Sequence, residues 1–125
     1  MKSMNEKKIY VWGESFAIVK AKEVISGAFA VIQDKNEITV VIEESKIGGN
    51  KSKIIEAENG YRIITFDMVL SFGLVGFLAK ISQALAQENI SIFAISAFST
   101  DHILVKESDL PKAIKKLEEI GFYKE

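Results

Sequence analysis

The sequence predicts an α+β fold, and three patterns carry this prediction. Between Leu74 and Leu85 apolar residues recur at the spacing of an amphipathic helix. Two other stretches place apolar runs on either side of short polar turns, as hairpin strands do. The hairpins also resemble each other without a gap, because Phe29 and the residues after it match Phe93 and those after it at an offset of 64. We therefore expect two related units, of which the first lacks a long helix.

The first half of the chain predicts strands and turns. The stretch IYVWGESFAIVKA, from Ile9, is rich in β-branched and aromatic residues and is broken at Gly13, which predicts one strand or two short ones. The runs AFAVIQ and ITVVIEE flank the polar tetrapeptide DKNE and predict a hairpin. Residues 45–53 contain a Gly-Gly pair and are linker-like, and KIIEA after them favours another short strand.

The second half predicts a β-α-β-β-α order, which is ferredoxin-like. A strand follows Gly60, and a helix runs from about Val75 to Glu88 and ends at Asn89 in a left-handed cap. The stretches ISIFAISAF and HILVKE form a hairpin around STD. A second helix begins at an N-cap, Ser108, and ends at Gly121, so that the last strand of a βαββαβ unit is short or supplied elsewhere.

Composition and charge exclude several classes of protein. The chain has 125 residues, is 48% hydrophobic and carries a formal net charge of −1, so no global field attracts nucleic acid or an anionic membrane. It has no cysteine, which excludes disulfides and thiolate metal sites and fits a reducing compartment. No apolar run reaches the ~18 to 20 residues of a membrane span, and no signal peptide is evident. We expect a soluble cytoplasmic protein.

The stretches SFGLVGFLAKISQALAQENISIFAIS and STDHILVKESDLPKAIKKL together resemble an ACT domain. More narrowly, the chain is similar to small tandem-ACT proteins related to the CASTOR arginine sensors, with EITVV from Glu37, a helix start at Gly76–Ala79 and the hairpin AISAFSTDHILVKE. His102 stands where a tyrosine is usual in that family. The resemblance implies an abbreviated ACT-like unit in residues 1–58 and an ACT domain in residues 59–125, side by side. It also implies an amino-acid ligand at their interface and self-association.

The order of elements predicts a ligand site on its own. The end of the strand after Gly60 and the turn of the second hairpin should meet at one edge of the sheet, beside a helix start whose N–H groups suit a carboxylate. Glycines there allow close approach, an aspartate in the turn can pair with an ammonium group, and the turn at residues 36–39 could close the pocket. The candidate ligand-binding residues are Asp67, Phe72, Gly73, Leu74, Val75, Gly76, Phe98, Ser99, Thr100, Asp101 and Thr39.

Other functions are less well supported by the residues. Catalysis lacks a nucleophile with its base, and the single histidine, His102, has no second ligand for a metal, so we expect no catalytic residues, metal or cofactor. The central strands also lack the paired aromatics and basic patch of an RNA-binding sheet. Two interpretations remain: a regulatory sensor that binds an amino acid and acts in trans, and a ligand-free dimerisation module. ISIFAISAF is apolar on both faces, so one face should meet the helices and either the first unit or a second chain should cover the other. This supports association, and we expect a homodimer.

Overall fold

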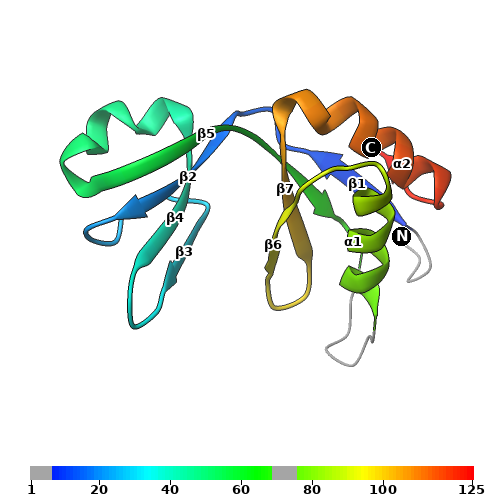
Figure 1. Ribbon diagram of the computed structural model, residues 1–125, viewed down its shortest axis with the longest axis horizontal. Coiled ribbons are helices and arrows are strands. Elements are labelled where there is room, and N and C mark those ends of the chain that lie inside the picture. Colours follow the sequence, from blue (N-terminus) through cyan, green and yellow to red (C-terminus); the bar gives the residue numbers. More distant parts are fainter. Residues whose placement is uncertain (1–6, 69–75) are drawn as a thin grey trace. The chain divides into compact units, whose positions relative to one another are not determined.

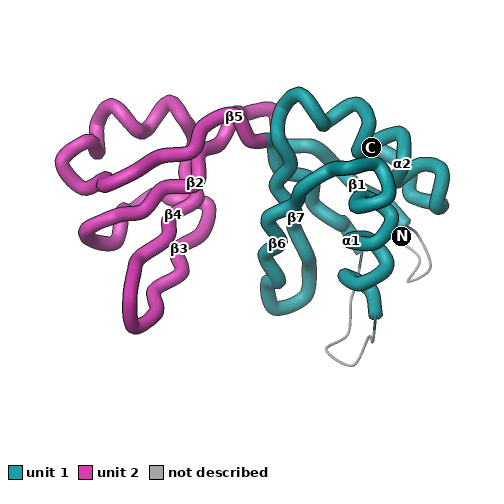
Figure 2. The backbone as a smooth tube through the Cα atoms, in the orientation of Figure 1, with its two compact units in different colours: residues 1–12, 62–125 teal, residues 13–61 magenta. Residues whose placement is uncertain are grey.

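The structure, a computed structural model, describes residues 7–68 and 76–125 (Figure 1). Strands and α-helices both occur in this part of the chain, so the predicted α+β class is confirmed. The chain forms two compact units: residues 1–12 with 62–125, called unit 1, and residues 13–61, called unit 2 (Figure 2). Of the described N-terminal residues, 7–12 belong to the same compact unit as the C-terminal half.

Unit 2 is an antiparallel sheet with the strand order β3-β4-β2-β5. Its elements are β2 (Phe16–Ala21), β3 (Ala30–Gln33), β4 (Ile38–Glu43), the 3-10 helices η1 (Glu44–Lys46) and η2 (Gly48–Lys53), and the first part of β5 (Ile54–Phe66). Alternate residues of β2 and β4, such as Val19, Val40 and Ile42, pack into a small core with Ile25 and with Ile47 of the turn between η1 and η2. This arrangement confirms the first predicted hairpin.

The turn of the β3–β4 hairpin is held by its own aspartate. The N–H of Asp34 donates to the carbonyl of Glu37 at 3.1 Å, and Asp34 Oδ1 accepts from the N–H groups of Asn36 and Glu37 at 2.8 and 2.9 Å. These two bonds favour the charged carboxylate and lower the pKa of Asp34. The tetrapeptide DKNE therefore forms the predicted turn, for the local reasons that favour aspartate there.

Two predictions for the middle of the chain are wrong in detail. The linker-like residues are wound into η1 and η2, where Ile47 and Asn50 donate their N–H groups back to Glu44 and Ile47. The two expected strands on either side of Gly60 are one strand, β5, which serves both units. Gly60 has a φ of +86°, which only glycine adopts readily, and the pairing with β2 shifts register beside it.

Unit 1 has the strand order β6-β7-β5-β1-β8 and carries both α-helices. Its further elements are β1 (Lys8–Val11), α1 (Phe77–Gln87), β6 (Phe93–Ser96), β7 (Asp101–Lys106), the 3-10 turn η3 (Glu107–Asp109), α2 (Leu110–Glu119) and β8 (Tyr123–Lys124). The place beside β5 that a final strand of the ferredoxin-like order would take belongs to β1, antiparallel to β5. Strand β8 lies outside β1 and parallel to it. The last strand is thus short, as predicted, and its usual place is filled from the N-terminus.

The core of unit 1 lies on the side of the sheet that the helices cover. Phe66 is fully buried in it and meets the rings of Phe77 and Phe122 edge to face, with centroids 5.4 and 5.3 Å apart. The other buried members come from both predicted helix faces and from alternate strand residues: Ile9, Ile64, Ile81, Leu85, Ile90, Ile103, Val105, Ala113 and Leu117. The amphipathic patterns in the sequence therefore identified this core correctly.

The ends of the helices follow the predicted C-caps but not the predicted N-cap. Asn89 and Gly121 both have positive φ, of 60° and 107°, just beyond α1 and α2, and the N–H of Phe122 donates to the carbonyl of Leu117 at 3.0 Å. The second helix begins later than expected, because η3 includes Ser108 and the cap position of α2 is Asp109, which makes no side-chain cap bond.

The two hairpins correspond at an offset of 63, so the sequence-based offset of 64 is one residue too long. Val40 and Ile42 of β4 face the core of unit 2, and their counterparts facing the core of unit 1 are Ile103 and Val105 of β7. The following 3-10 turns, η1 and η3, are related by the same offset. A slip of one residue exchanges the two faces of a strand, and the alternation of apolar residues alone does not reveal it when both faces are apolar.

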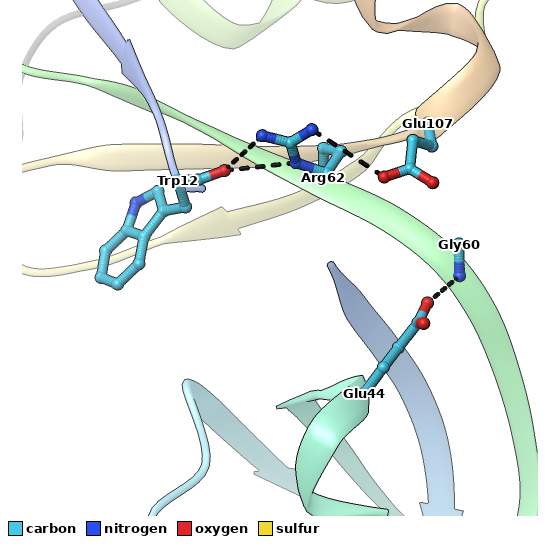
Figure 3. Close-up of polar contacts among 5 residues, drawn as sticks. All are labelled: Trp12, Glu44, Gly60, Arg62 and Glu107. Carbon is cyan, nitrogen blue, oxygen red and sulfur yellow. Dashed lines mark hydrogen bonds and ion pairs between the residues drawn. The ribbon is translucent and has the colours of Figure 1, made fainter. Parts of the chain in front are cut away.

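Arg62 fastens β1 to the sheet of unit 1 at the point where the chain leaves that unit. Its Nε and one terminal nitrogen donate to the carbonyl oxygen of Trp12 at 3.2 and 2.8 Å, and its other terminal nitrogen lies 3.8 Å from a carboxylate oxygen of Glu107 (Figure 3). In unit 2, Glu44 accepts the N–H of Gly60 at 2.6 Å (Figure 3). Strand β5 passes from unit 2 to unit 1 between Tyr61 and Arg62. A side chain contacts β5 just before this point, at Gly60, and the side chain of Arg62 makes its contacts just after it.

Candidate functional site

The start of α1 offers backbone donors that no side chain of the described residues caps. Gly76 is the cap residue, with φ of 84° and ψ of 3°, and it has no side chain that could accept the N–H groups of the first turn. The carbonyl of Gly76 accepts the first helical hydrogen bond, from Lys80 N–H at 3.0 Å. A helix start of this kind carries partial positive charge and outward-pointing N–H groups, which suits a carboxylate.

The β6–β7 hairpin supplies the second part of the predicted site. Its turn closes where Ala97 N–H donates to the carbonyl of Thr100 at 2.8 Å, so Phe98 and Ser99 form the exposed tip, and Phe98 is 82% exposed. Asp101 is the first residue of β7 and pairs with Ser96, so it lies at the end of a strand rather than within the turn.

Strand alternation places Asp101 on the helix-bearing side of the sheet. It shares its face of β7 with Ile103 and Val105, which are both in the core beneath the helices. The β6–β7 turn and the start of α1 lie at the same end of unit 1 (Figure 1). The structure therefore brings the turn and the helix start to one end of the sheet, as the order of elements predicts.

The remaining candidate residues divide into three groups. Phe72, Gly73, Leu74 and Val75 lie outside the described residues. Asp67 directly follows β5, where its N–H donates to the carbonyl of Lys8 at 2.8 Å and its carboxylate lies 4.0 Å from the Lys8 ammonium. Thr39 belongs to unit 2, where it is the second residue of β4 and not part of the 34–37 turn, opposite Lys20 of β2 and Ile32 of β3.

A cavity of about 820 Å³ opens beside α1, and most of the residues around it were not identified from the sequence. Among the candidate residues that the structure describes, only Gly76 lines it, and Lys7, Lys80 and Phe122 contribute to it as well. In the sequence pattern, Lys80 does not fall on the apolar face of the helix, and Lys7 is 69 positions before Gly76. Helical spacing therefore gives no indication that these residues line one cavity. The lining can be found only from the pairing of β1 and β8, which brings the two chain ends together.

On the sheet face opposite the helices, a hydrogen-bonded chain joins β5 and β7 to Trp12, which directly follows β1. The indole Nε1–H of Trp12 donates to Thr65 Oγ1 at 2.8 Å, and Thr65 Oγ1 lies 2.8 Å from His102 Nδ1. The indole can only donate, so the Thr65 hydroxyl accepts from Trp12, and it either donates to His102 Nδ1 or accepts from it according to the imidazole tautomer. Thr65 is 2% exposed, and burial lowers the pKa of His102 below its ordinary 6.5, while the nearby Asp101 carboxylate raises it.

Acidification from pH 7 to pH 5 is expected to destabilise the protein partly through His102. Because its folded-state pKa lies below the ordinary 6.5, the unfolded chain binds a proton that the folded state resists. The contribution to the free energy of unfolding is complete above about pH 6.5 and is lost as the pH falls from there through the folded-state pKa. Urea denaturation at pH 7 and pH 5 should show a smaller pH dependence for His102→Gln than for the parent protein.

Protonation of Asp34, whose pKa is also lowered, does not overlap with the pH range of this test. Asp34 has an ordinary pKa of 3.8 that its two backbone hydrogen bonds lower further, so its effect on stability lies at more acidic pH. An equal loss of stability on acidification in His102→Gln and in the parent protein would show that His102 is not the group responsible.

Two further observations concern the described part of the chain. Among residues 7–68 and 76–125, no three His, Cys, Asp or Glu side chains are grouped so that they could hold a metal ion. In the same residues no helix has both the length and the apolarity needed to span a membrane.

Comparison with known proteins gives both a family and a fold. No curated protein matches the chain. Residues 56–119, slightly more than half of the chain, match the profile of the family described as ACT domain. Among solved structures, protein Atu0741 from Agobacterium tumefaciens has a TM-score of 0.81 at 23% identity, over 96% of this chain and 92% of that one.

Two aspartate kinase structures are similar as well. The enzyme from Clostridium acetobutylicum, described as allosteric, has a TM-score of 0.72 at 17% identity, over 94% of this chain but only 36% of the enzyme. The ligand-free regulatory subunit of aspartate kinase from Thermus thermophilus has a TM-score of 0.66 at 10% identity, over 89% of this chain and 94% of the subunit. At these identities the likeness establishes the fold alone.

Proposed function

Because the chain belongs to the ACT domain family, we propose that it is a regulatory protein that binds an amino acid or a similar small zwitterion and has no enzymatic activity of its own. The ligand would contact the start of α1 and the β6–β7 turn, through residues 67, 72–76 and 98–101. The similarity to the aspartate kinase regulatory subunit supports a regulatory role. Any effect on an enzyme would be exerted in trans, by ligand-linked association in the cytoplasm.

The observation that carries the proposal is the start of α1, where the cap residue makes no side-chain cap bond. Gly76 occupies the cap position with a left-handed φ of 84°, and an added Cβ there would meet nothing within 4 Å. There is room for a side chain at this position, but a residue with a Cβ would be strained in the left-handed conformation. Gly76 therefore has no side chain that could accept the N–H groups of the first turn. A ligand α-carboxylate is the simplest group that satisfies those donors.

Asp101 supplies the complementary charge in this proposal. It is half-buried at the end of β7, on the helix-bearing face and at the end of the unit where α1 begins (Figure 1). A carboxylate there can pair with the α-ammonium of a ligand whose α-carboxylate is bound at Gly76. Asp67 is a weaker candidate because Lys8 already lies 4.0 Å from its carboxylate.

The relation to tandem-ACT proteins of the CASTOR type belongs to the same proposal. The correspondence of β4 and η1 with β7 and η3 supports two ACT-like units, in residues 1–58 and 59–125, with the first abbreviated. Thr39 would then take part in binding only if its unit contributes to the ligand site. Homodimerisation is the assembly we expect.

A ligand-free association module is the alternative, and one feature favours it. Strand β3 is an edge strand of unit 2, and its Val31 and Ile32 are 38% and 44% exposed. Apolar residues on an open edge are suited to pairing with another chain. The association module predicts a dimer that no amino acid affects.

A calorimetric screen of the twenty amino acids against the purified protein tests the proposal, and we expect heat of binding with at least one. Gly76→Ala should then weaken that binding, because the left-handed backbone that exposes the donors is strained by a Cβ. Gly60→Ala is the matched control: Gly60 has a φ of +86°, and an added Cβ there also meets nothing within 4 Å. Both variants should lose about 1–2 kcal/mol of stability, but only Gly76→Ala should lose affinity.

Asp101→Asn tests the second half of the site in the same assay. It should weaken binding of the same amino acid, whereas Asp109→Asn, which removes an equal charge at the start of α2, should not. If no amino acid gives heat or a thermal shift and the oligomeric state is unaffected by all of them, the association module is the correct interpretation.

A further inference from the structure

The cavity beside α1 is large and mostly apolar. Its volume of about 820 Å³ falls within the ~300–1,000 Å³ typical of small-molecule sites. The walls come from the second residue after β5, from α1 and from the segment between α2 and β8, through Met68, Phe77, Ile81, Ala84, Ile120 and Phe122. Several of these belong to the core or pack against it, so the walls are held by the fold of unit 1.

The charged groups that line this cavity from the described residues have the same sign. Lys7 and Lys80 are its only charged lining residues among the described parts of the chain, and both are exposed. Neither forms an ion pair with another described residue; the Lys7 ammonium lies 5.8 Å from the centre of the Phe122 ring. Within the same described parts, no carboxylate lines the cavity. An anionic group on an apolar body complements such a site, and a cationic group does not.

This cavity and the proposed amino-acid site lie on opposite sides of β5. In the sheet of unit 1, β7 with Asp101 neighbours β5 on one side, whereas β1 and β8 lie on the other. Lys7 directly precedes β1 and Phe122 directly precedes β8. The two sites share Gly76 but have different charge: Asp101 offers a carboxylate for an ammonium group, and the cavity offers two ammonium groups for a carboxylate.

We propose that this cavity is a second binding site, which takes a small monocarboxylate with an aromatic or branched apolar body and no ammonium group. The apolar body would lie against Phe77, Ala84 and Phe122, and the carboxylate would lie at the mouth between Lys7 and Lys80. A free α-ammonium is disfavoured, because it would be placed close to two lysines and no acidic group of the described lining would compensate its charge.

Three probes of one shape and different charge test this proposal: 3-phenylpropionate, 3-phenylpropan-1-ol and 3-phenylpropylamine. Titrations followed by amide chemical shifts should show binding of 3-phenylpropionate at the cavity residues. The alcohol should bind roughly tenfold more weakly, the factor expected from the loss of one charge-assisted contact. The amine should bind more weakly still. Equal or tighter binding of the amine, or no binding of any probe, would overturn the proposal.

Variants locate the site and separate it from the amino-acid site. Lys7→Gln with Lys80→Gln should lower the affinity for 3-phenylpropionate to that of the alcohol, whereas Lys112→Gln with Lys115→Gln, on the exposed side of α2, should not change it. Ala84→Phe should fill the cavity and abolish binding of every probe that binds the parent protein, with the thermal transition confirming a folded protein. Asp101→Asn should leave 3-phenylpropionate binding unchanged, so this site can be present even if the amino-acid proposal fails. Undiminished affinity in the double lysine variant refutes the role given to these side chains.

Discussion

Replacing Phe66 with alanine is expected to lower the free energy of unfolding by about 3–5 kcal/mol, which is more than we expect from any other single substitution in this chain. Phe66 is completely buried, and its ring meets both Phe77 and Phe122 edge to face, with interplanar angles of 89° and 70°. The substitution therefore removes buried apolar surface, two aromatic contacts and the volume that α1 and the C-terminal segment share. Urea denaturation monitored by circular dichroism measures the change.

This loss is large relative to the ~5–15 kcal/mol that stabilise a typical domain, so the experiment also includes a milder variant and a control. Phe66→Leu keeps most of the volume and should cost less than Phe66→Ala. Phe98→Ala makes the same chemical change at a side chain that is 82% exposed and should alter stability by no more than about 0.5 kcal/mol. Equal effects of Phe66→Ala and Phe98→Ala would show that Phe66 does not occupy the core as described.

Replacing Thr65 with valine is expected to cost about 1–3 kcal/mol although the side chain keeps its shape. The hydroxyl of Thr65 is the acceptor for the indole of Trp12 and the partner of His102, so its loss leaves both without this bond. Trp12 is the only tryptophan in the chain, and its fluorescence reports on this site directly. We expect a shift of its emission maximum together with the lower midpoint of denaturation.

The matched control is Thr39→Val, on β4 of unit 2. Thr39 is also a strand residue but is half-buried, and its substitution should change stability by no more than about 0.5 kcal/mol and leave the Trp12 emission unchanged. If Thr65→Val is as stable as the parent protein, the chain from Trp12 to His102 does not contribute to folding.

Local patterns in the sequence were sufficient to predict most of unit 1. The helical spacing of Phe77, Ile81 and Leu85 identified the buried face of α1, and Asn89 and Gly121 identified the ends of both helices. These features depend on interactions within a few residues, and one sequence contains the information for them. The apolar run of β4 was also recognised as a strand, but its two faces were not distinguished, because Val40, Val41 and Ile42 are all buried.

The features that the sequence did not reveal depend on pairing between distant residues. Nothing in the stretch around Ile9 indicates that β1 lies beside the end of β5, opposite Phe66, rather than in the unit formed by the residues that follow it. The same pairing brings Lys7 to the cavity beside α1. For the candidate site, the sequence placed Gly76 and the β6–β7 turn at one end of the sheet, and the structure agrees, but Asp101 proved to be a strand residue and Thr39 lies in the other unit.

The placement of β1 also sets the order in which the chain can fold during synthesis. Unit 2 is a continuous stretch, residues 13–61, and can be completed as soon as it leaves the ribosome. Strand β1 is made first, yet its partner residues on β5 end at Phe66 and those on β8 are Tyr123 and Lys124. Until Phe66 emerges, β1 has no strand to pair with, and its other edge stays open until Tyr123 and Lys124 emerge, a form that is open to aggregation and to chaperone binding. Completion of unit 1 therefore waits for the last residues of the chain.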